Sequence, residues 1–222
     1  MFGNKYNMTP DENALFAKRN IVDSIWKEAH LEGIAVTFPQ TNEIYEGRTV
    51  SGLTIKDTMV INNLKHAWFF VLDNLGADID IRFVLEVNRL VGDNNVVLDA
   101  GRLRDYDVAI GGTKWIPEIP TADQVIETLK VIMALKNPVE RGLRLFCEIC
   151  RGQWFTDGNK RTAQLVANAS LINEGCGVLS IATEDQQSAM ELLIEYYETG
   201  NYSSLEKFLY DRALEGIVYP NR

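Results

Sequence analysis

The chain has 222 residues, of which 46% are hydrophobic and 24% are charged, as is usual for a globular protein with a buried core. Its formal net charge of −9, with no basic tract to offset it, argues against general binding to nucleic acids or to acidic membranes. No apolar run approaches the roughly 20 residues that span a membrane, and the first residues lack the apolar segment of a signal peptide. We therefore expect a cytoplasmic protein that binds neither nucleic acid nor membrane.

The cysteine pattern argues against a disulfide framework, because three cysteines cannot all pair within one chain. Cys147 and Cys150 form a C-x-x-C pair on a predicted helix, without a second pair that would complete a zinc site. Buried helix thiols are the interpretation that we favour.

Helix-start signals recur along the chain. Thr9-Pro10-Asp11-Glu12 is a capping box with proline at the first helical position, and it predicts a helix that runs to about Glu32 and stops at Gly33. Apolar periodicity predicts a long helix from Thr54 to Asn74 and another from Asp80 to Leu90. Further helices are expected at 121–135, 138–151, 161–173, 183–196 and 203–214. The predicted fold class is mainly α.

One segment breaks the helical pattern. Between Asp99 and Pro120 the chain carries glycines and prolines, and apolar and polar residues alternate on both sides of Gly111-Gly112. Alternation around a Gly-Gly pair is typical of a β-hairpin. An isolated hairpin is marginally stable in water, so this one must lean on the helices. A structural connector is the alternative interpretation.

A short polar loop separates the helices predicted at 138–151 and 161–173. It holds Asp157, Gly158 and Asn159, followed by the cations Lys160 and Arg161. The start of a helix offers unpaired N–H groups and partial positive charge, so such a loop can bind phosphate, and a neighbouring carboxylate suits Mg²⁺. The spacing is not that of a Walker A loop. An ordinary helix connection, with Asp157 or Asn159 as N-cap, is the alternative.

The stretch from Gln153 to Thr162 resembles the signature of the Fic/Doc (Fido) family, which reads His-Pro-Phe-x-Asp/Glu-Gly-Asn-Gly/Lys-Arg. The matching residues are Phe155, Asp157, Gly158, Asn159 and Arg161, and Lys160 follows the Doc-like version. The resemblance implies that Asp157 holds Mg²⁺. It also implies that the phosphates of a nucleotide are bound by Gly158, Asn159, Lys160, Arg161 and Gln164. The implied cofactors are ATP and Mg²⁺.

The same resemblance implies the architecture and the partner. A Fic-like helical bundle with a short β-hairpin flap is expected, and the flap residues are Val108, Ile110, Gly111, Gly112 and Thr113. In the family the flap pairs with an extended segment of a target protein, as in strand addition to an exposed edge. Members of the family often self-associate, although nothing in this sequence marks an interface.

Three positions depart from the signature. Gln153 stands where the family has its catalytic histidine, Trp154 replaces the proline, and Gln164 replaces a second arginine. Histidine suits the removal of a proton from an attacking hydroxyl because its pKa lies near working pH, whereas an amide can orient a hydroxyl but cannot take its proton. The predicted catalytic position, Gln153, therefore lacks a general base.

The stretch from Asn42 to Gly47 resembles the inhibitory motif of the same family, Ser/Thr-x-x-x-Glu-Gly/Asn. In the family this glutamate pairs with the second arginine of the signature and blocks seating of the γ-phosphate. Glu46 is thus the predicted inhibitory residue. With Gln164 in place of the arginine, Glu46 can share only a weaker hydrogen bond or reach Arg161. A relic without inhibitory function is the alternative.

We expect an N-terminal helical region at 1–79, a Fic-like domain at 80–216 and a tail at 217–222. The function implied by the resemblance is transfer of AMP or phosphate from ATP–Mg²⁺ to a hydroxyl side chain of a target protein, at a rate reduced by the missing base. One alternative is a nucleotide-binding pseudoenzyme that regulates or binds a partner. The other is a helical protein in which the loop has a purely structural role.

Overall fold

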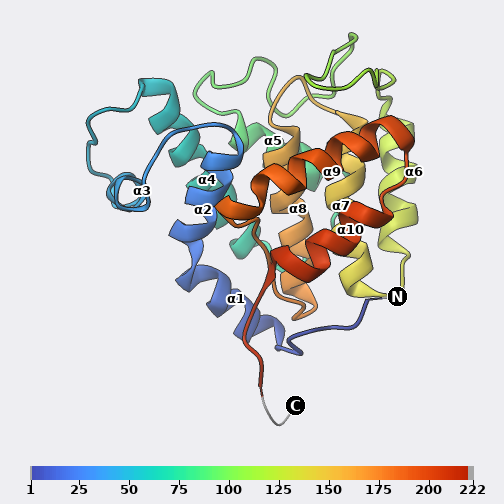
Figure 1. The fold of residues 1–222 in the computed structure, drawn as a ribbon, viewed down its shortest axis with the longest axis horizontal. Helices are drawn as coiled ribbons and strands as arrows, with labels where there is room; N and C mark the ends of the chain where they lie inside the picture. Colours follow the sequence, from blue (N-terminus) through green and yellow to red (C-terminus); the bar gives the residue numbers. More distant parts are fainter. Residues whose placement is uncertain (1, 220–222) are drawn as a thin grey trace.

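Threonine side chains begin four helices of the computed structural model, which describes residues 2–219. Thr9, Thr37, Thr54 and Thr121 each accept a hydrogen bond from the N–H three residues on, and the side chain of that residue accepts one from the threonine N–H. The described residues form ten α-helices (Figure 1): α1 (Pro10–Arg19), α2 (Ile21–Leu31), α3 (Phe38–Tyr45), α4 (Ile55–Asp73), α5 (Ile81–Val91), α6 (Ala122–Met133), α7 (Pro138–Gly152), α8 (Asn159–Asn173), α9 (Gln186–Thr199) and α10 (Ser203–Phe208). The predicted mainly α class is confirmed.

Helix α8 forms the centre of the molecule. Thirteen of its 15 residues are buried, and helices α1, α4, α5 and α7 all contact it. Helix α7 packs closely along it because Gly142 has no side chain: a Cβ at this position would lie 2.5 Å from Cγ of Leu171. The buried apolar side chains form one cluster from Ala17 to Leu214, so the N-terminal helices pack against the rest of the chain. The start of α8 is therefore held from several sides.

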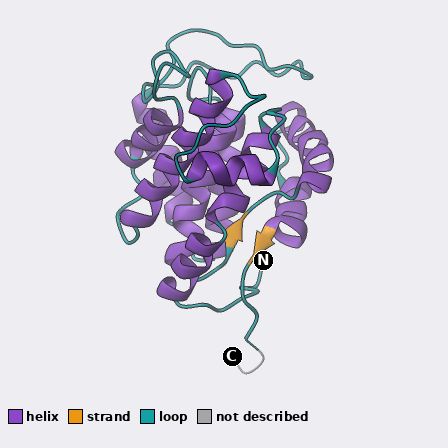
Figure 2. Ribbon diagram, turned by 90° about the vertical axis from the view of Figure 1, so that its left-hand side faces the viewer, coloured by secondary structure: helices purple, strands orange, loops and turns teal. Residues whose placement is uncertain are grey.

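Within residues 2–219 the structure contains one small sheet, in which β1 (Val178–Leu179) pairs antiparallel with β2 (Leu214–Glu215) (Figure 2). Neither strand belongs to the predicted hairpin. Residues 107–116, all of them described, turn at Gly111–Gly112 as predicted but contain no strand. The strand pairing predicted for the flap is thus wrong; the N–H of Lys114 donates instead to Glu198 of α9, as described below.

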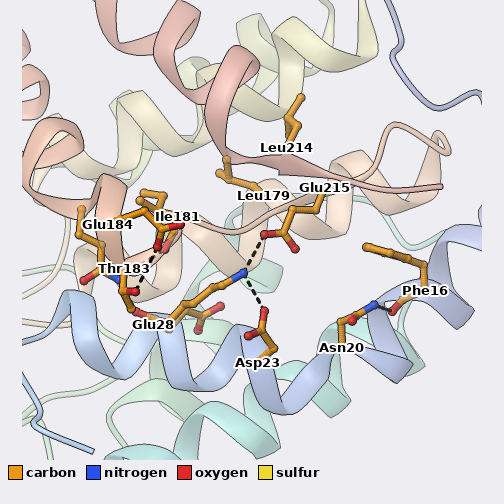
Figure 3. Close-up of polar contacts among 12 residues, drawn as sticks. Phe16, Asn20, Asp23, Glu28, Leu179, Ile181, Thr183, Glu184, Leu214 and Glu215 are labelled. Carbon is orange, nitrogen blue, oxygen red and sulfur yellow. Dashed lines mark hydrogen bonds and ion pairs between the residues drawn. The ribbon is translucent and has the colours of Figure 1, made fainter. Parts of the chain in front are cut away.

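The helix predicted from the capping box at Thr9 to Glu32 is two helices. The backbone N–H and the side-chain Nδ2 of Asn20 both donate to the carbonyl of Phe16, which ends α1 (Figure 3). The helix predicted to start at Thr183 is also different. A short 3₁₀ turn (Thr183–Asp185) precedes α9, and α10 continues into a π-turn (Leu209–Ala213).

Lys27 fixes α2 on the core. Its Nζ lies 2.7 Å from Oδ2 of Asp23 and 2.7 Å from Oε1 of Glu215, so it joins α2 to β2. At the start of α9, Gln186 donates from Nε2 to the carbonyl of Lys27 at 2.8 Å. These contacts determine the rotation of α2 about its axis, and with it the direction in which Glu28 and Glu32 face.

Candidate functional site

The loop between α7 and α8 is held by the side chain of Asn159. Its Oδ1 accepts a hydrogen bond from the N–H of Phe155 at 3.0 Å, and its Nδ2 donates to the carbonyl of Phe155 at 2.8 Å. The ring of Phe155 is buried in the core with 1% of its surface exposed. An asparagine that binds both backbone groups of an anchored residue gives the loop one conformation before any ligand arrives.

Gly158 begins α8 in a conformation that favours glycine. Its φ is +78°, and a Cβ at this position would lie 3.0 Å from Cγ1 of Val91. Asn88 of α5 supports the turn, because its Nδ2 donates to the carbonyl of Asp157 at 3.2 Å and to Oγ1 of Thr162 at 3.1 Å. No side chain caps the helix at this end, so the N–H groups of the first turn can bind an anion.

Two cationic side chains, Lys160 and Arg161, lie at the start of α8, and the carboxylate of Glu32 at the end of α2 forms ion pairs with both. Oε1 of Glu32 is 3.5 Å from Nζ of Lys160, and Oε2 is 3.4 Å from Nε of Arg161. Only 5% of the Arg161 side chain and 16% of the Glu32 side chain are exposed. Nε of Arg161 is buried without a hydrogen-bond partner, because the geometry toward Glu32 is that of an ion pair only. The predicted anion site therefore contains an internal anion.

A cavity of about 210 Å³ opens beside this ion pair. It is lined by the loop, by Glu32, by Ile110 and Gly111 of the flap, and by Met190, Ile194 and Tyr197 of α9. Sites for small molecules usually measure about 300–1,000 Å³, so this cavity is small for a nucleotide while Glu32 occupies it. Larger cavities of about 390 and 580 Å³ lie near α6; Trp154 lines the first of them, but Asp157, Lys160 and Arg161 line neither.

Asp157 is the carboxylate of the loop. Its Oδ1 accepts a hydrogen bond from the N–H of Gly158 at 2.6 Å and lies 3.3 Å from Nη2 of Arg161. The side chain keeps 55% of its surface exposed. Among the described residues, no group of three or more His, Cys, Asp or Glu side chains is placed to hold a metal ion. One exposed carboxylate beside the predicted phosphate site fits Mg²⁺, an ion that keeps most of its waters and phosphate ligands.

Gln153 ends α7 in the left-handed conformation, with φ +44°. Its Nε2 donates to the carbonyl of Cys150 at 2.6 Å, and its Oε1 accepts from Nδ2 of Asn159 at 3.2 Å. Tyr197 lies against the same amide, and burial raises the pKa of this phenol, so it stays protonated at neutral pH. Neither of the two histidines of the chain lines the cavity. The position predicted to be catalytic thus carries no base.

The structure does not place Gln164 on the cavity, in contrast to its predicted role in nucleotide binding. The side chain is buried in α8, where Nε2 donates to Oε1 of Glu28 at 3.2 Å and to the carbonyl of Leu179 at 3.3 Å. Nε1 of Trp68 also donates to Oε1 of Glu28, at 3.1 Å, while Oε2 is buried without a partner. Burial raises the pKa of Glu28 to about 8.

The structure also does not place Glu46, the predicted inhibitory residue, at the site. It is exposed at the end of α3 and does not line the cavity. The glutamate that reaches the loop is Glu32, which ends α2 and is followed by Gly33 with φ +78°. Glu32 and Glu46 each end a helix and are each followed by a glycine, so the sequence contains the Glu-Gly pattern of the inhibitory motif twice. Only the tertiary side-chain contacts distinguish them, because Glu28 and Glu32 meet Gln164 and Arg161 of α8.

The flap is tied to the site by side chains. Tyr106 donates from its hydroxyl to Oγ1 of Thr156 in the loop at 3.0 Å. On the other side, the Thr113 hydroxyl and the Lys114 N–H donate to Oε1 of Glu198 in α9, at 2.6 and 2.7 Å. Of the predicted flap residues, Ile110 and Gly111 therefore meet the cavity, Thr113 anchors the segment, and Val108 and Gly112 are not lining residues.

Comparison with known proteins agrees with this arrangement. Residues 78–171, which include the flap, α7 and most of α8, match the model of the Fic/DOC family. The protein adenylyltransferase fic-1 of Caenorhabditis elegans is 27% identical over 194 residues, which cover 82% of this chain and 36% of that protein. The protein adenylyltransferase Fic of Nematostella vectensis is 25% identical over 198 residues, which cover 83% and 44%. The chain thus spans between a third and a half of the length of these relatives.

Solved structures share the fold. Fic-1 (residues 134–508) from C. elegans superposes with a TM-score of 0.74 at 21% identity, over 88% of this chain and 62% of that one. A Fic domain-containing signaling protein from Bacteroides thetaiotaomicron superposes with a TM-score of 0.71 at 17% identity, over 92% and 86%. The helical bundle of this chain is therefore the fold of these solved Fic structures, and within it residues 78–171 match the Fic/DOC family.

Proposed function

We propose that this protein binds ATP–Mg²⁺ at the start of α8 and transfers AMP to a hydroxyl side chain of a target protein, at a low rate. The observation that carries the proposal is one cavity lined by the start of α8, by Lys160 and by the flap tip, together with Arg161, which forms an ion pair with the cavity residue Glu32. Two cations and a helix start bind phosphates, and a neighbouring flap can present a peptide. The names of the relatives, both protein adenylyltransferases, support the choice of AMP.

Asp157 would hold Mg²⁺, which supplies positive charge at the phosphates. The other groups belong to the chain. Arg161 would neutralise phosphate oxygens once Glu32 is displaced, and Lys160 would do so from a more exposed position. In the transfer, the target oxygen bonds to the α-phosphorus while the bond from that phosphorus to the bridging oxygen breaks and pyrophosphate leaves. The hydroxyl proton goes to a phosphate oxygen or to water, because Gln153 cannot accept it.

The rate should therefore be low. A positioned general base contributes about 10²–10⁴-fold, and the remaining catalysis comes from positioning and charge neutralisation. Transfer of the γ-phosphate instead of AMP would need the nucleotide to lie in the opposite direction. Lys160, at the Doc-like position, is the residue that would favour this orientation.

A nucleotide-binding regulator without transfer activity is the second candidate function. It is favoured by the contacts of Gln153, whose amide is bound at both ends, by Cys150 and by Asn159, and so is not free to orient a hydroxyl. In this case the protein would respond to ATP–Mg²⁺ and act on a partner by binding.

One paired experiment separates these functions. The wild type, Gln153→His and Asp157→Ala proteins are incubated with lysate and with ATP labelled at the α- or γ-phosphate, and ATP–Mg²⁺ binding is measured directly. Transfer of the α-label by the wild type, increased about 10²-fold or more by histidine and lost in Asp157→Ala, supports the adenylyltransferase. Transfer of the γ-label instead identifies a phosphotransferase. Binding without transfer, unless histidine is present, supports the regulator, and absence of binding contradicts both.

A further inference from the structure

Arg104, which precedes the flap, is buried with 3% of its surface exposed. All hydrogen bonds of its guanidinium go to backbone carbonyls. Nε donates to Gln153 at 2.6 Å, Nη1 donates to Tyr106 at 2.7 Å, and Nη2 donates to Pro117 at 3.2 Å and to Glu118 at 2.5 Å. The backbone N–H of Arg104 donates to the carbonyl of Trp154 at 3.0 Å. One residue thus contacts three separate segments.

These segments are the two ends of the flap and the start of the signature loop. Tyr106 is at the N-terminal end of the flap, and Pro117 and Glu118 are at its C-terminal end. Gln153 is the first residue of the loop that leads to Asp157. Because residues 107–116 form no strand ladder, the closure at the base is not provided by backbone pairing. Instead, one guanidinium closes a loop whose tip, at Ile110 and Gly111, lines the cavity.

The chemistry of arginine suits this task. Its planar guanidinium has five donors in a fixed fork, whereas the ammonium group of lysine is a compact point charge. Within the described residues, Arg104 forms no salt bridge; its direct partners are backbone carbonyls, and the charge of Asp107 acts on it without direct contact. A buried cation without a carboxylate carries a desolvation cost, and it is a weak contribution to stability. Its contacts therefore indicate a geometric role rather than a stabilising one.

We propose that Arg104 is a positioning residue, which holds the flap at a set distance from the signature loop and thereby aligns the target hydroxyl with the bound phosphates. This inference rests on the proposed function of the site. Arg104 itself touches neither nucleotide nor target in this role. A displacement of about 1 Å at a reacting centre can cost 10²-fold in rate, so a loose flap base lowers transfer without removing the phosphate site.

The test compares Arg104→Lys with Arg102→Lys, a matched substitution two residues away at an exposed position. Three quantities are measured on the full chain: hydrogen exchange of residues 105–118 and 153–158, the dissociation constant of ATP–Mg²⁺, and label transfer to lysate proteins in the Gln153→His background. For Arg104→Lys we expect exchange to rise at least tenfold at the hydrogen-bonded amides of both segments, which are Lys114, Trp115 and Phe155. Maximal transfer should fall about 10²-fold, while the ATP concentration at half-maximal rate changes less than threefold. Arg102→Lys should match its parent in all three.

Unchanged exchange in residues 105–118, or a loss of transfer that merely follows a loss of ATP binding, would overturn the role of Arg104. If neither the wild type nor Gln153→His transfers label, the proposed adenylyltransferase function is wrong. The hydrogen exchange result still decides whether Arg104 holds the flap. If Arg104→Lys does not fold, hydrogen exchange of the wild-type protein tests the proposal instead. Residues 105–118 and 153–154 should then open together, with one free energy and one dependence on denaturant. Independent opening of the two segments contradicts the proposal.

Discussion

Oε2 of Glu32 lies 3.4 Å from Nε of Arg161, and the other oxygen of the same carboxylate lies 3.5 Å from Nζ of Lys160. One glutamate at the end of α2 thus neutralises both cations at the start of α8. A phosphate group bound by those cations would have to displace it, so the proposed nucleotide would compete with the internal ion pair for the same charges.

The first prediction concerns this competition. Replacing Glu32 by glutamine removes the internal anion and leaves Lys160 and Arg161 to the nucleotide. Partly buried ion pairs of this kind are worth on the order of 1–2 kcal/mol together, so ATP–Mg²⁺ should bind roughly five- to thirtyfold more tightly. Calorimetry or fluorescence titration measures the dissociation constant. Glu46→Gln is the matched control and should bind as the wild type does; equal affinity for all three proteins would contradict the competition.

The second prediction concerns pH. Burial raises the pKa of Glu28 to about 8, from an ordinary value near 4.5. Between these values the folded protein keeps a proton that the unfolded chain releases. The free energy of unfolding therefore falls as pH rises from about 4.5 to about 8, by roughly 1 kcal/mol per pH unit from this group. The groups that face Glu28 are Arg161 and Gln164 of α8, Trp68 of α4 and Glu32 of its own helix.

Glu28→Gln should lack this slope, because the amide does not titrate, and should be more stable than the wild type at pH 8. Urea unfolding between pH 5 and pH 8 measures the difference between the two proteins, in which the other titrating groups cancel. Glu46→Gln should keep the wild-type slope, since Glu46 is exposed. Parallel stability curves for Glu28→Gln and the wild type would show that Glu28 is ionised in the folded protein.

The third prediction concerns the helix start. Gly158→Ala places a side chain in the left-handed region, at φ +78°, with its Cβ 3.0 Å from Val91. Such a conformation costs an alanine about 1–2 kcal/mol, and the free energy of unfolding should decrease by at least this amount. Gly111→Ala is the matched control, because its φ is not in this region and a Cβ there has no heavy atom within 4 Å. Its effect on stability should remain below about 0.5 kcal/mol.

The fourth prediction concerns the loop clamp. Asn159→Ala removes the acceptor of the buried Phe155 N–H and should destabilise the protein by about 1–3 kcal/mol. Hydrogen exchange at the Phe155 amide should accelerate more than that at Leu193, which is buried in α9 and does not line the cavity. Asn159→Asp keeps the oxygen that accepts this bond, so it should retain more of the protection. Loss of protection that is uniform along the chain would indicate global unfolding rather than a local clamp.

Much of the fold follows from residues that are neighbours in the chain. The capping boxes at Thr54 and Thr121 each depend on two side chains three residues apart, so the helices begin where they were predicted. The position of the signature loop was also predictable, because Asp157, Gly158 and Asn159 are contiguous and Asn159 binds residues within six positions of itself; the support from Asn88 of α5 was not. The turn at Gly111–Gly112 belongs to the same class.

Contacts between distant residues decided the rest. Two Glu-Gly pairs end two helices, and their local energies are alike; Glu32 rather than Glu46 meets Arg161 because Lys27 and the apolar face of α2 fix its rotation against the core. The flap turns as its glycines require, but whether its two sides pair depends on competing partners such as Arg104 and Glu198. Short-range propensity is additive along a chain, whereas the choice among equivalent partners depends on which of them the packed core brings within reach.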